Sequence, residues 1–272
     1  MKLGDSRVIY ESETKQTKVY ITDDCLVKVI NKKSPYYGSF LKELEYYKIF
    51  SGNVAPRLIT SDDTSFSTQF LRGGVLKDYV ENIEPCELEN VLMKVIIALE
   101  AFNSVSVVET QGQKTGGFKF IRAFVGKITI LLLSGPKGIE SSTREKKLNK
   151  IFSIGLKPFS IILGCLSLII LSSTKSMLLG KRFHGDLHLN NIILDENNHV
   201  FLVDFENVEE YSGKFVDLLY FFSILVSKLD SSKRRKLSRV IFAYFSLSSL
   251  EKLVWIAGCS IMSVAINRNS RF

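Results

Sequence analysis

Short runs of apolar and β-branched residues, separated by polar turns, occupy the first part of the chain. Positions 7–12, 18–22 and 25–30 have the length and composition of strands, and two further strand-like runs follow at 57–60 and 65–71. The pair of aspartates just before position 25 is a turn signal. This part of the chain is therefore predicted to be rich in strands.

One stretch within this part has helical periodicity instead. In residues 39–50 the positions of one face recur at the spacing of an α-helix. They are Phe40, Glu43, Tyr47 and Phe50. Gly52 and Pro56 are expected to end the helix.

Beyond Arg72-Gly73-Gly74, which is typical of a hinge or turn, the pattern becomes mainly helical. The segments that predict helices are 87–103, 218–229, 238–245 and 250–265. Residues 158–174 carry no charge and lie at the lower edge of the length that a bilayer-spanning helix needs, about 20 residues. We expect a buried core helix there, with peripheral membrane contact as the alternative.

Composition narrows the class of protein. Hydrophobic residues make up 46% of the chain, which excludes a disordered protein. The 36 Lys and Arg exceed the 28 Asp and Glu, so the net charge is +8 and an anionic partner is expected: phosphate, nucleotide, nucleic acid or a membrane face. The four cysteines are scattered and form neither a disulfide framework nor a zinc site, and the N-terminus has no apolar signal region, so we expect a cytoplasmic protein.

The chemistry is concentrated in residues 183–206, FHGDLHLNNIILDENNHVFLVDFE. Two short apolar strands separated by a polar turn predict a hairpin here. The hairpin would bring Asp186, Asn191 and Asp204 to the same end. Two carboxylates and an amide oxygen are ligands that Mg²⁺ prefers, with water and phosphate oxygens completing its shell.

The motif H-G-D-L-H-x-x-N, followed after the hairpin by V-D-F-E, resembles the catalytic and metal-binding loops of the kinase-like phosphotransferases. The match is closest to the aminoglycoside phosphotransferase and choline kinase group, with the lipopolysaccharide kinases as near relatives. The resemblance implies an α+β, bilobal, protein-kinase-like fold. Its small antiparallel-sheet N-lobe would span residues 1–72 and its mostly helical C-lobe residues 73–272.

The same resemblance implies ATP and Mg²⁺ as cofactors and gives roles to the loop residues. Asp186 would be the catalytic carboxylate, and Asn191 and Asp204 would hold the metal. His184 is expected to anchor the loop by hydrogen bonds. His188 is either a brace of the loop or a contact to the substrate.

In the N-terminal part, Lys28 resembles the strand lysine that contacts the α- and β-phosphates, and Glu43 resembles the helix glutamate that pairs with it. Glu45 is the competing glutamate, but Glu43 shares a face with Tyr47 and Phe50. Residues where the adenine would bind are expected in the last strand before the hinge: Gln69, Phe70 and Leu71. Asp217 resembles the buried aspartate that supports the catalytic loop.

The chain departs from the family pattern in its phosphate-covering loop, which falls within residues 11–17. No glycine occurs between Gly4 and Gly38, although Lys15 or Lys18 could compensate electrostatically. The interval between Asp204 and Asp217 is too short for a protein-kinase activation segment, which favours small-molecule or glycan substrates.

These features favour an ATP-dependent kinase that phosphorylates a hydroxyl of a small molecule or a cell-envelope glycan or glycolipid. The acceptor would be bound by the insertion at 104–180 and the C-terminal helices. The alternative is a catalytically silent kinase-fold protein that binds nucleotide or a partner. A nucleic-acid-binding function is disfavoured because basic and aromatic residues do not interleave. The basic run at 233–239 is a solvated helix face or a contact with an anionic membrane or glycan phosphate.

Overall fold

The computed structural model describes most of the chain outside one long central segment. The described residues are 7–22, 24–80, 83–104, 182, 184–208, 214–249, 252, 253, 255, 256 and 259. Contacts divide the chain into two compact units, the first formed by residues 1–105 with 184–209 and the second by residues 106–183 with 210–272. The predicted lobe boundary at residue 72 stays a prediction.

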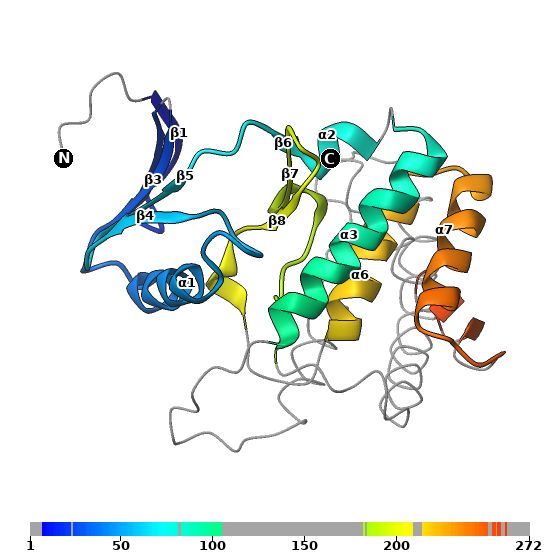
Figure 1. The fold of residues 1–272 in the computed structure, drawn as a ribbon. Helices are drawn as coiled ribbons and strands as arrows, with labels where there is room; N and C mark the ends of the chain where they lie inside the picture. The colour runs from blue at the N-terminus through cyan, green and yellow to red at the C-terminus, as the bar shows by residue number, and fades with distance from the viewer. Residues whose placement is uncertain are drawn as a thin grey trace, which may run out of the picture. The chain divides into compact units, whose positions relative to one another are not determined.

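The first unit begins with a five-stranded antiparallel sheet (Figure 1). Its strands are β1 (Arg7–Ser12), β2 (Thr17–Ile21), β3 (Cys25–Ile30), β4 (Leu58–Ser61) and β5 (Ser65–Gln69). The spatial order is β1-β2-β3-β5-β4, so β3 is the central strand. All the strand-like runs of the N-terminal part are thus confirmed, with ends shifted by a residue or two.

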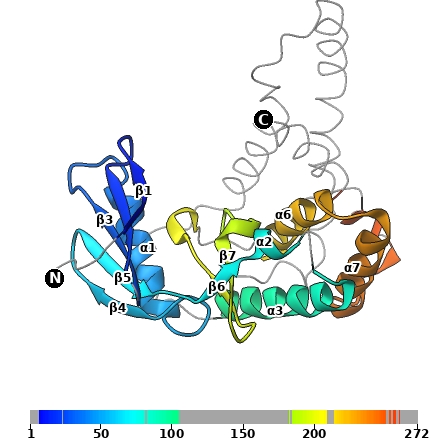
Figure 2. The ribbon, with the colours of Figure 1, turned by 90° about the horizontal axis from the view of Figure 1, so that it is seen from above.

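Helix α1 (Tyr37–Phe50) lies against one face of this sheet (Figures 1 and 2). Its buried positions are Phe40, Glu43, Leu44, Tyr46, Tyr47 and Phe50. The rings of Phe40 and Tyr47 lie 5.3 and 5.1 Å from the ring of Phe66 on β5. The predicted buried face is therefore confirmed, and it is the face that contacts the sheet.

The first unit continues with a three-stranded antiparallel sheet of β6 (Gly73–Val75), β7 (Ile192–Asp195) and β8 (Val200–Leu202). Helices α2 (Leu76–Val80) and α3 (Pro85–Ser104) follow β6. The backbone N–H of Leu202 donates a 2.8 Å hydrogen bond to the carbonyl of Val54, just after α1. This bond fixes the hairpin of β7 and β8 to the part of the unit that carries α1.

The sequence predicts a hinge or turn at Arg72-Gly73-Gly74, whereas Gly73 and Gly74 are the first residues of β6 and pair with Asp195 and Leu194. The close pairing explains why glycine is needed. Gly73 has a φ of +143°, and a Cβ there would lie 2.0 Å from the carbonyl oxygen of Leu194.

Aromatic rings join these parts of the first unit around Phe205. This residue begins the 3₁₀ turn η2 (Phe205–Asn207) and is fully buried. Its ring lies 5.2 Å from that of Tyr47, 5.3 Å from that of His184 and 5.9 Å from that of Phe102. The segment after β8 is therefore packed against both α1 and α3.

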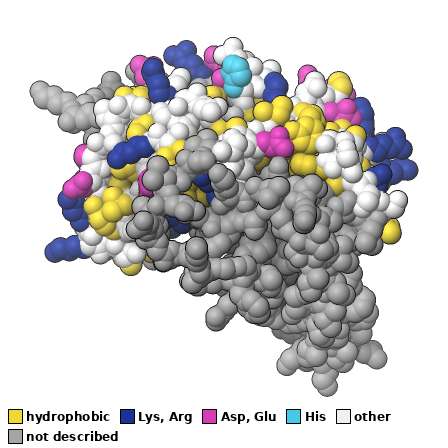
Figure 3. Space-filling view, turned by 60° about the horizontal axis from the view of Figure 1, so that its bottom comes forward, with side chains coloured by type: hydrophobic (Ala, Val, Ile, Leu, Met, Phe, Trp, Pro, Cys, Tyr) yellow, Lys and Arg dark blue, Asp and Glu magenta, His cyan; other side chains and the backbone are white. Residues whose placement is uncertain are grey.

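In the second unit the described helices are α6 (Lys214–Ser227) and α7 (Ser231–Tyr244). The side chain of Asp230 accepts hydrogen bonds from the backbone N–H groups of Ser232 and Lys233, which caps α7 at its N-terminus. The basic run at 233–239 thus lies within this helix and does not flank it, and the helix predicted at 238–245 begins earlier. Figure 3 shows basic side chains gathered along the edge where α7 lies.

Several predictions fall on residues whose structure is not described. They include the apolar segment 158–174, the acceptor-binding insertion 104–180 after its first residue, and most of the helix expected at 250–265. Among the helices that the structure does describe, none has the length and apolar character needed to span a bilayer.

Candidate functional site

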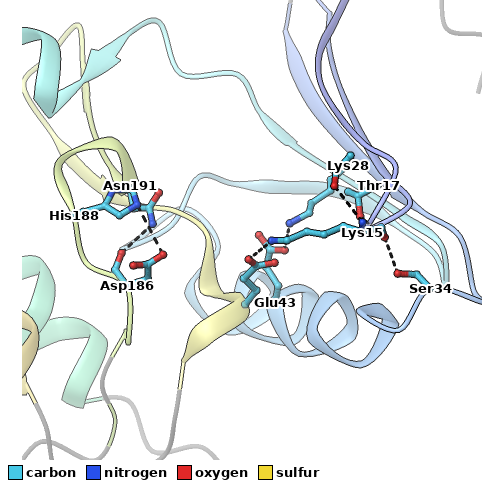
Figure 4. A network of polar contacts seen from close by, with 10 residues as sticks. Lys15, Thr17, Lys28, Ser34, Glu43, Asp186, His188 and Asn191 are labelled. Atoms are coloured by element: carbon cyan, nitrogen blue, oxygen red, sulfur yellow. Dashed lines mark hydrogen bonds and ion pairs between the residues drawn. The ribbon is translucent and has the colours of Figure 1, made fainter. Parts of the chain in front are cut away.

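The site is built around an ion pair between the central strand and the helix. Lys28 on β3 lies opposite Val19 of β2 and Phe66 of β5. Its Nζ donates to Glu43 Oε2 at 2.5 Å, with the two side chains only 17% and 4% exposed (Figure 4). Glu45 is exposed, so the structure contains the predicted pair and not its alternative.

Burial shifts the pKa values of the two partners in opposite directions. Burial raises the pKa of Glu43 to about 7, although the charge of Lys28 opposes this shift. For Lys28, burial lowers the pKa, but the negative charges of Glu43, Asp204 and Glu206 outweigh it and raise the pKa above its usual value. The ammonium of Lys28 therefore stays charged, whereas the charge of Glu43 changes near neutral pH.

The raised pKa of Glu43 predicts a pH-dependent stability. Because the folded protein holds this proton more tightly than the unfolded chain, the free energy of unfolding should fall as pH rises from about 4.5 to about 7. Glu43→Gln removes this titration. The stability of the variant, compared with that of wild type at the same pH, should therefore rise over that interval. Urea unfolding at about pH 5 and about pH 8 measures the difference. The exposed Glu45→Gln should follow the wild-type profile, and parallel profiles for Glu43→Gln and wild type would contradict the prediction.

The loop that carries the H-G-D motif is held close to η2. Gly185 has a φ of +79°, and a Cβ there would lie 2.3 Å from the carbonyl oxygen of Asn207, so only glycine allows this approach. His184 is fully buried, and its Nε2 donates a 3.0 Å hydrogen bond to the carbonyl of Val203. His184 thus makes the kind of hydrogen bond expected of a loop anchor.

The hairpin of β7 and β8 brings together the three residues that the sequence places at one end of it. Asn191 ends the 3₁₀ turn η1 (Leu189–Asn191), and its Nδ2 donates to the backbone carbonyl of Asp186 at 2.9 Å. The N–H of Val203 donates to the carbonyl of Asn191 at 3.0 Å, which sets Asp204 beside this loop. The amide nitrogen of Asn191 is engaged, so its amide oxygen is the atom suited to a cation.

His188 contacts both the turn and the carboxylate of the motif. Its Nδ1 accepts a 3.2 Å hydrogen bond from the N–H of Asn190, which places the proton of a neutral ring on Nε2. That Nε2 lies 3.8 Å from Asp186 Oδ2 (Figure 4). The ring therefore directs an N–H group toward the carboxylate.

Asp204 has the environment of a metal-binding carboxylate. Its backbone is left-handed, with φ +66°, and its buried Oδ1 has no hydrogen-bond partner among the described residues. Burial and the charge of Glu206 raise its pKa, although Lys28 opposes them. A cation at this oxygen would remove the cost of burying it.

These residues fit a magnesium ion that completes its shell elsewhere. The described residues contain no cluster of three or more His, Cys, Asp or Glu side chains able to hold a metal. Asp204 and the amide oxygen of Asn191 are too few ligands for a closed site. They suit Mg²⁺, which keeps several waters and takes substrate phosphate oxygens.

A second lysine reaches the site from the turn between β1 and β2. Lys15 Nζ lies 2.5 Å from Glu206 Oε1. Lys18, the other lysine considered from the sequence, instead pairs with Glu11 at 2.7 Å, where both side chains are about half exposed. The family motif assigns no role to Glu206, although its place in V-D-F-E, two residues after Asp204, indicates that it lies near the site.

The other predicted residues lie at the end of β5, in the segment after it, and in α6. Gln69 ends β5 opposite Cys25, and the N–H of Phe70 donates to the carbonyl of Asp24. Phe70 and Leu71 are partly exposed between β5 and β6. Asp217 is buried in α6 of the second unit, so its predicted support of the catalytic loop stays a prediction.

Known proteins are similar to this chain in part of its sequence and in its fold. A model of the ecdysteroid kinase-like family matches residues 182–253, which include the H-G-D and V-D-F-E motifs. No curated protein matches the chain.

The structure is similar to an ADP-bound aminoglycoside phosphotransferase, APH(2'')-Ib, at 15% identity and a TM-score of 0.56, covering 95% of this chain and 82% of the other. A Plasmodium vivax ethanolamine kinase matches at 14% identity and a TM-score of 0.55, with 97% and 74% covered. A choline kinase from Cryptosporidium parvum matches at 14% identity and a TM-score of 0.55, covering 98% of this chain and 83% of the other. Identities this low establish the fold and leave the substrate open. The chain therefore has the α+β, protein-kinase-like fold of the aminoglycoside phosphotransferases and the choline and ethanolamine kinases.

Proposed function

We propose that this protein is an ATP-dependent phosphotransferase that moves the γ-phosphoryl group to a hydroxyl of a small molecule or of a glycan or glycolipid. The observation that carries the proposal is the Lys28–Glu43 pair, whose ammonium also feels the charge of Asp204. A buried lysine that is held by a glutamate, within the field of a carboxylate suited to Mg²⁺, is the arrangement that kinases use for phosphoryl transfer.

The nucleotide would be held mainly by charge. Lys28 would contact the phosphates, Glu43 would keep its ammonium in place, and Gln69, Phe70 and Leu71 would border the adenine. Asp204 and Asn191 would hold Mg²⁺, which supplies positive charge to the phosphate oxygens when bound. The lone buried Oδ1 of Asp204 supports this assignment.

Asp186 would orient the acceptor hydroxyl and take its proton, while His184 holds the loop. The N–H of His188 that faces Asp186 supports a brace that keeps the carboxylate in position, in preference to a direct contact with substrate. Catalysis would then rest on positioning and electrostatics, because phosphoryl transfer needs little covalent chemistry from the protein.

For the acceptor, we propose the residues at 104–180 and the C-terminal helices as the binding region. Two matched structures are named as an ethanolamine kinase and a choline kinase, and a third as an aminoglycoside phosphotransferase, so hydroxyls on amino alcohols and sugars are the first to test. We also propose a cytoplasmic location, with peripheral contact between the basic residues of α7 and an anionic membrane face.

The test is Mg²⁺-dependent ATP binding and consumption over a panel of amino alcohols, sugars, aminoglycosides and lipid-linked glycans. Wild type should bind ATP, and Lys28→Met should weaken binding about tenfold to hundredfold, because a charged hydrogen bond to phosphate is lost. Lys32→Met is the matched control, since Lys32 follows β3 but pairs with the exposed Asp63. Failure of wild type to bind Mg-ATP would overturn the proposal.

The second candidate is a catalytically silent nucleotide-binding protein. The observation that favours it is the absence of glycine between Gly4 and Gly38, the region of the phosphate-covering loop. ATP binding that depends on Lys28 but yields no turnover with any acceptor would support this candidate over the kinase.

A further inference from the structure

The turn between β1 and β2 contains no glycine, and it carries a lysine whose side chain reaches the site. In kinases this loop covers the nucleotide phosphates, and its glycines let backbone N–H groups approach them. Here the N–H of Lys15 donates to Ser12 Oγ at 3.1 Å, and the N–H of Gln16 donates to the carbonyl of Glu13 at 3.2 Å. These two N–H groups are engaged within the turn and are not free to bind phosphate.

Residues of the segment between β3 and α1 donate hydrogen bonds to the backbone of this turn. The carbonyl of Lys15 accepts hydrogen bonds from Ser34 Oγ at 2.6 Å and from Thr17 Oγ1 at 3.2 Å. The carbonyl of Gln16 accepts a 3.1 Å bond from the N–H of Asn31. These hydrogen bonds hold the backbone of Lys15 in a defined position, so a change of partner would involve its side chain.

That side chain runs beside Lys28 toward the same group of carboxylates (Figure 4). Its Nζ lies 2.5 Å from Glu206 Oε1 and 5.7 Å from the ring centre of Tyr36. Partial burial lowers the pKa of Lys15, but the hydrogen bond and charge of Glu206, together with the charge of Asp204, raise it. Lys15 is thus a charged group within the electrostatic reach of the proposed metal-binding residue.

The bond between Lys15 and Glu206 is suited to exchange. The Lys15 side chain is 34% exposed and that of Glu206 17%, so water reaches the ammonium group and weakens its attraction to the carboxylate. A nucleoside triphosphate carries more negative charge than one carboxylate and offers several oxygens to an ammonium group. It would therefore compete successfully with Glu206 for Lys15.

We propose that Lys15 binds the β- and γ-phosphates of ATP in place of a glycine-rich loop, and that Glu206 holds its ammonium when no nucleotide is present. This inference rests on the proposed function and adds a phosphate ligand to the same site. Because Glu206 would compete with ATP for Lys15, removing the charge of Glu206 should strengthen nucleotide binding.

The experiment measures Kd for Mg-ATP and for adenosine by calorimetry on the full chain. Lys15→Met should weaken ATP binding about tenfold to hundredfold and leave adenosine binding unchanged, whereas Lys15→Arg should retain most of the affinity. Glu206→Gln should tighten ATP binding about twofold to fivefold. The gain should disappear in the double variant, because no lysine remains to be released. Unchanged adenosine binding shows that each variant is folded.

The hairpin provides a matched control in Lys18 and Glu11, another lysine–glutamate pair that joins β1 to β2. Lys18→Met and Glu11→Gln should bind ATP as wild type does. The inference is overturned if Lys15→Met binds ATP normally, or if Glu206→Gln fails to strengthen binding in a Lys15-dependent way.

Lys28→Met separates this inference from the proposed function. If ATP binding depends on Lys28 but not on Lys15, the proposed function stands and the role of Lys15 is rejected. If wild type does not bind Mg-ATP, both are rejected.

Discussion

Replacement of Asp186 by asparagine is expected to lower the rate of phosphoryl transfer by about 10²- to 10⁴-fold, the usual contribution of a general base. Asparagine keeps the shape of the side chain but cannot accept the proton of the acceptor hydroxyl. The bond from Asn191 goes to the backbone carbonyl of Asp186, so the substitution leaves it in place. The Kd for Mg-ATP should therefore change by less than about threefold.

The rate of ADP formation with the acceptor found in the panel, measured beside the Kd, checks this expectation. Asp63→Asn is the control, because Asp63 is a highly exposed loop aspartate whose partner is Lys32. Wild-type turnover in Asp186→Asn would remove Asp186 from the chemistry. Equal losses of binding and turnover would instead place Asp186 among the residues that hold the nucleotide.

The parts of the site that could be predicted are those governed by local periodicity. Helical spacing puts Glu43 on the face that carries Tyr47 and Phe50, and burial of that face turns the carboxylate toward the sheet and Lys28. The same reasoning applies to the hairpin of β7 and β8, because a short turn forces its strands to pair and so brings Asn191 and Asp204 to one end.

Features that depend on distant partners could not be predicted. Gly73 and Gly74 have the local chemistry of a hinge, and their place in a strand comes from β7, which lies far along the chain. Likewise, Lys15 and Lys18 are equivalent in sequence terms. Only the geometry of the turn, with Gln16 at a φ of +49°, and the position of Glu206 distinguish them.

The geometry of the candidate site also depends on the buried ring of Phe205, which the motif V-D-F-E does not single out for stability. Phe205→Ala is expected to lower the free energy of unfolding by about 3–5 kcal/mol, the usual cost of removing a buried aromatic side chain. The ring is fully buried and contacts the rings of Tyr46, Tyr47, Phe50, Phe102 and His184. Removing the ring would leave a cavity bordered by α1 and α3. The packed helices could not easily move to fill this cavity.

Urea unfolding followed by far-UV circular dichroism measures this loss. Phe205→Leu retains much of the buried volume and should recover part of it. Phe245→Ala is the control, because Phe245 is partly exposed and has a single described ring contact, with Tyr244, so its loss should be clearly smaller. A change below about 1 kcal/mol for Phe205→Ala would contradict the prediction. Phe205 directly follows Asp204, so the carboxylate proposed to hold Mg²⁺ loses its support when the ring is removed. Mg-ATP binding should therefore weaken even where Phe205→Ala is still folded, a result that a purely local cavity would not produce.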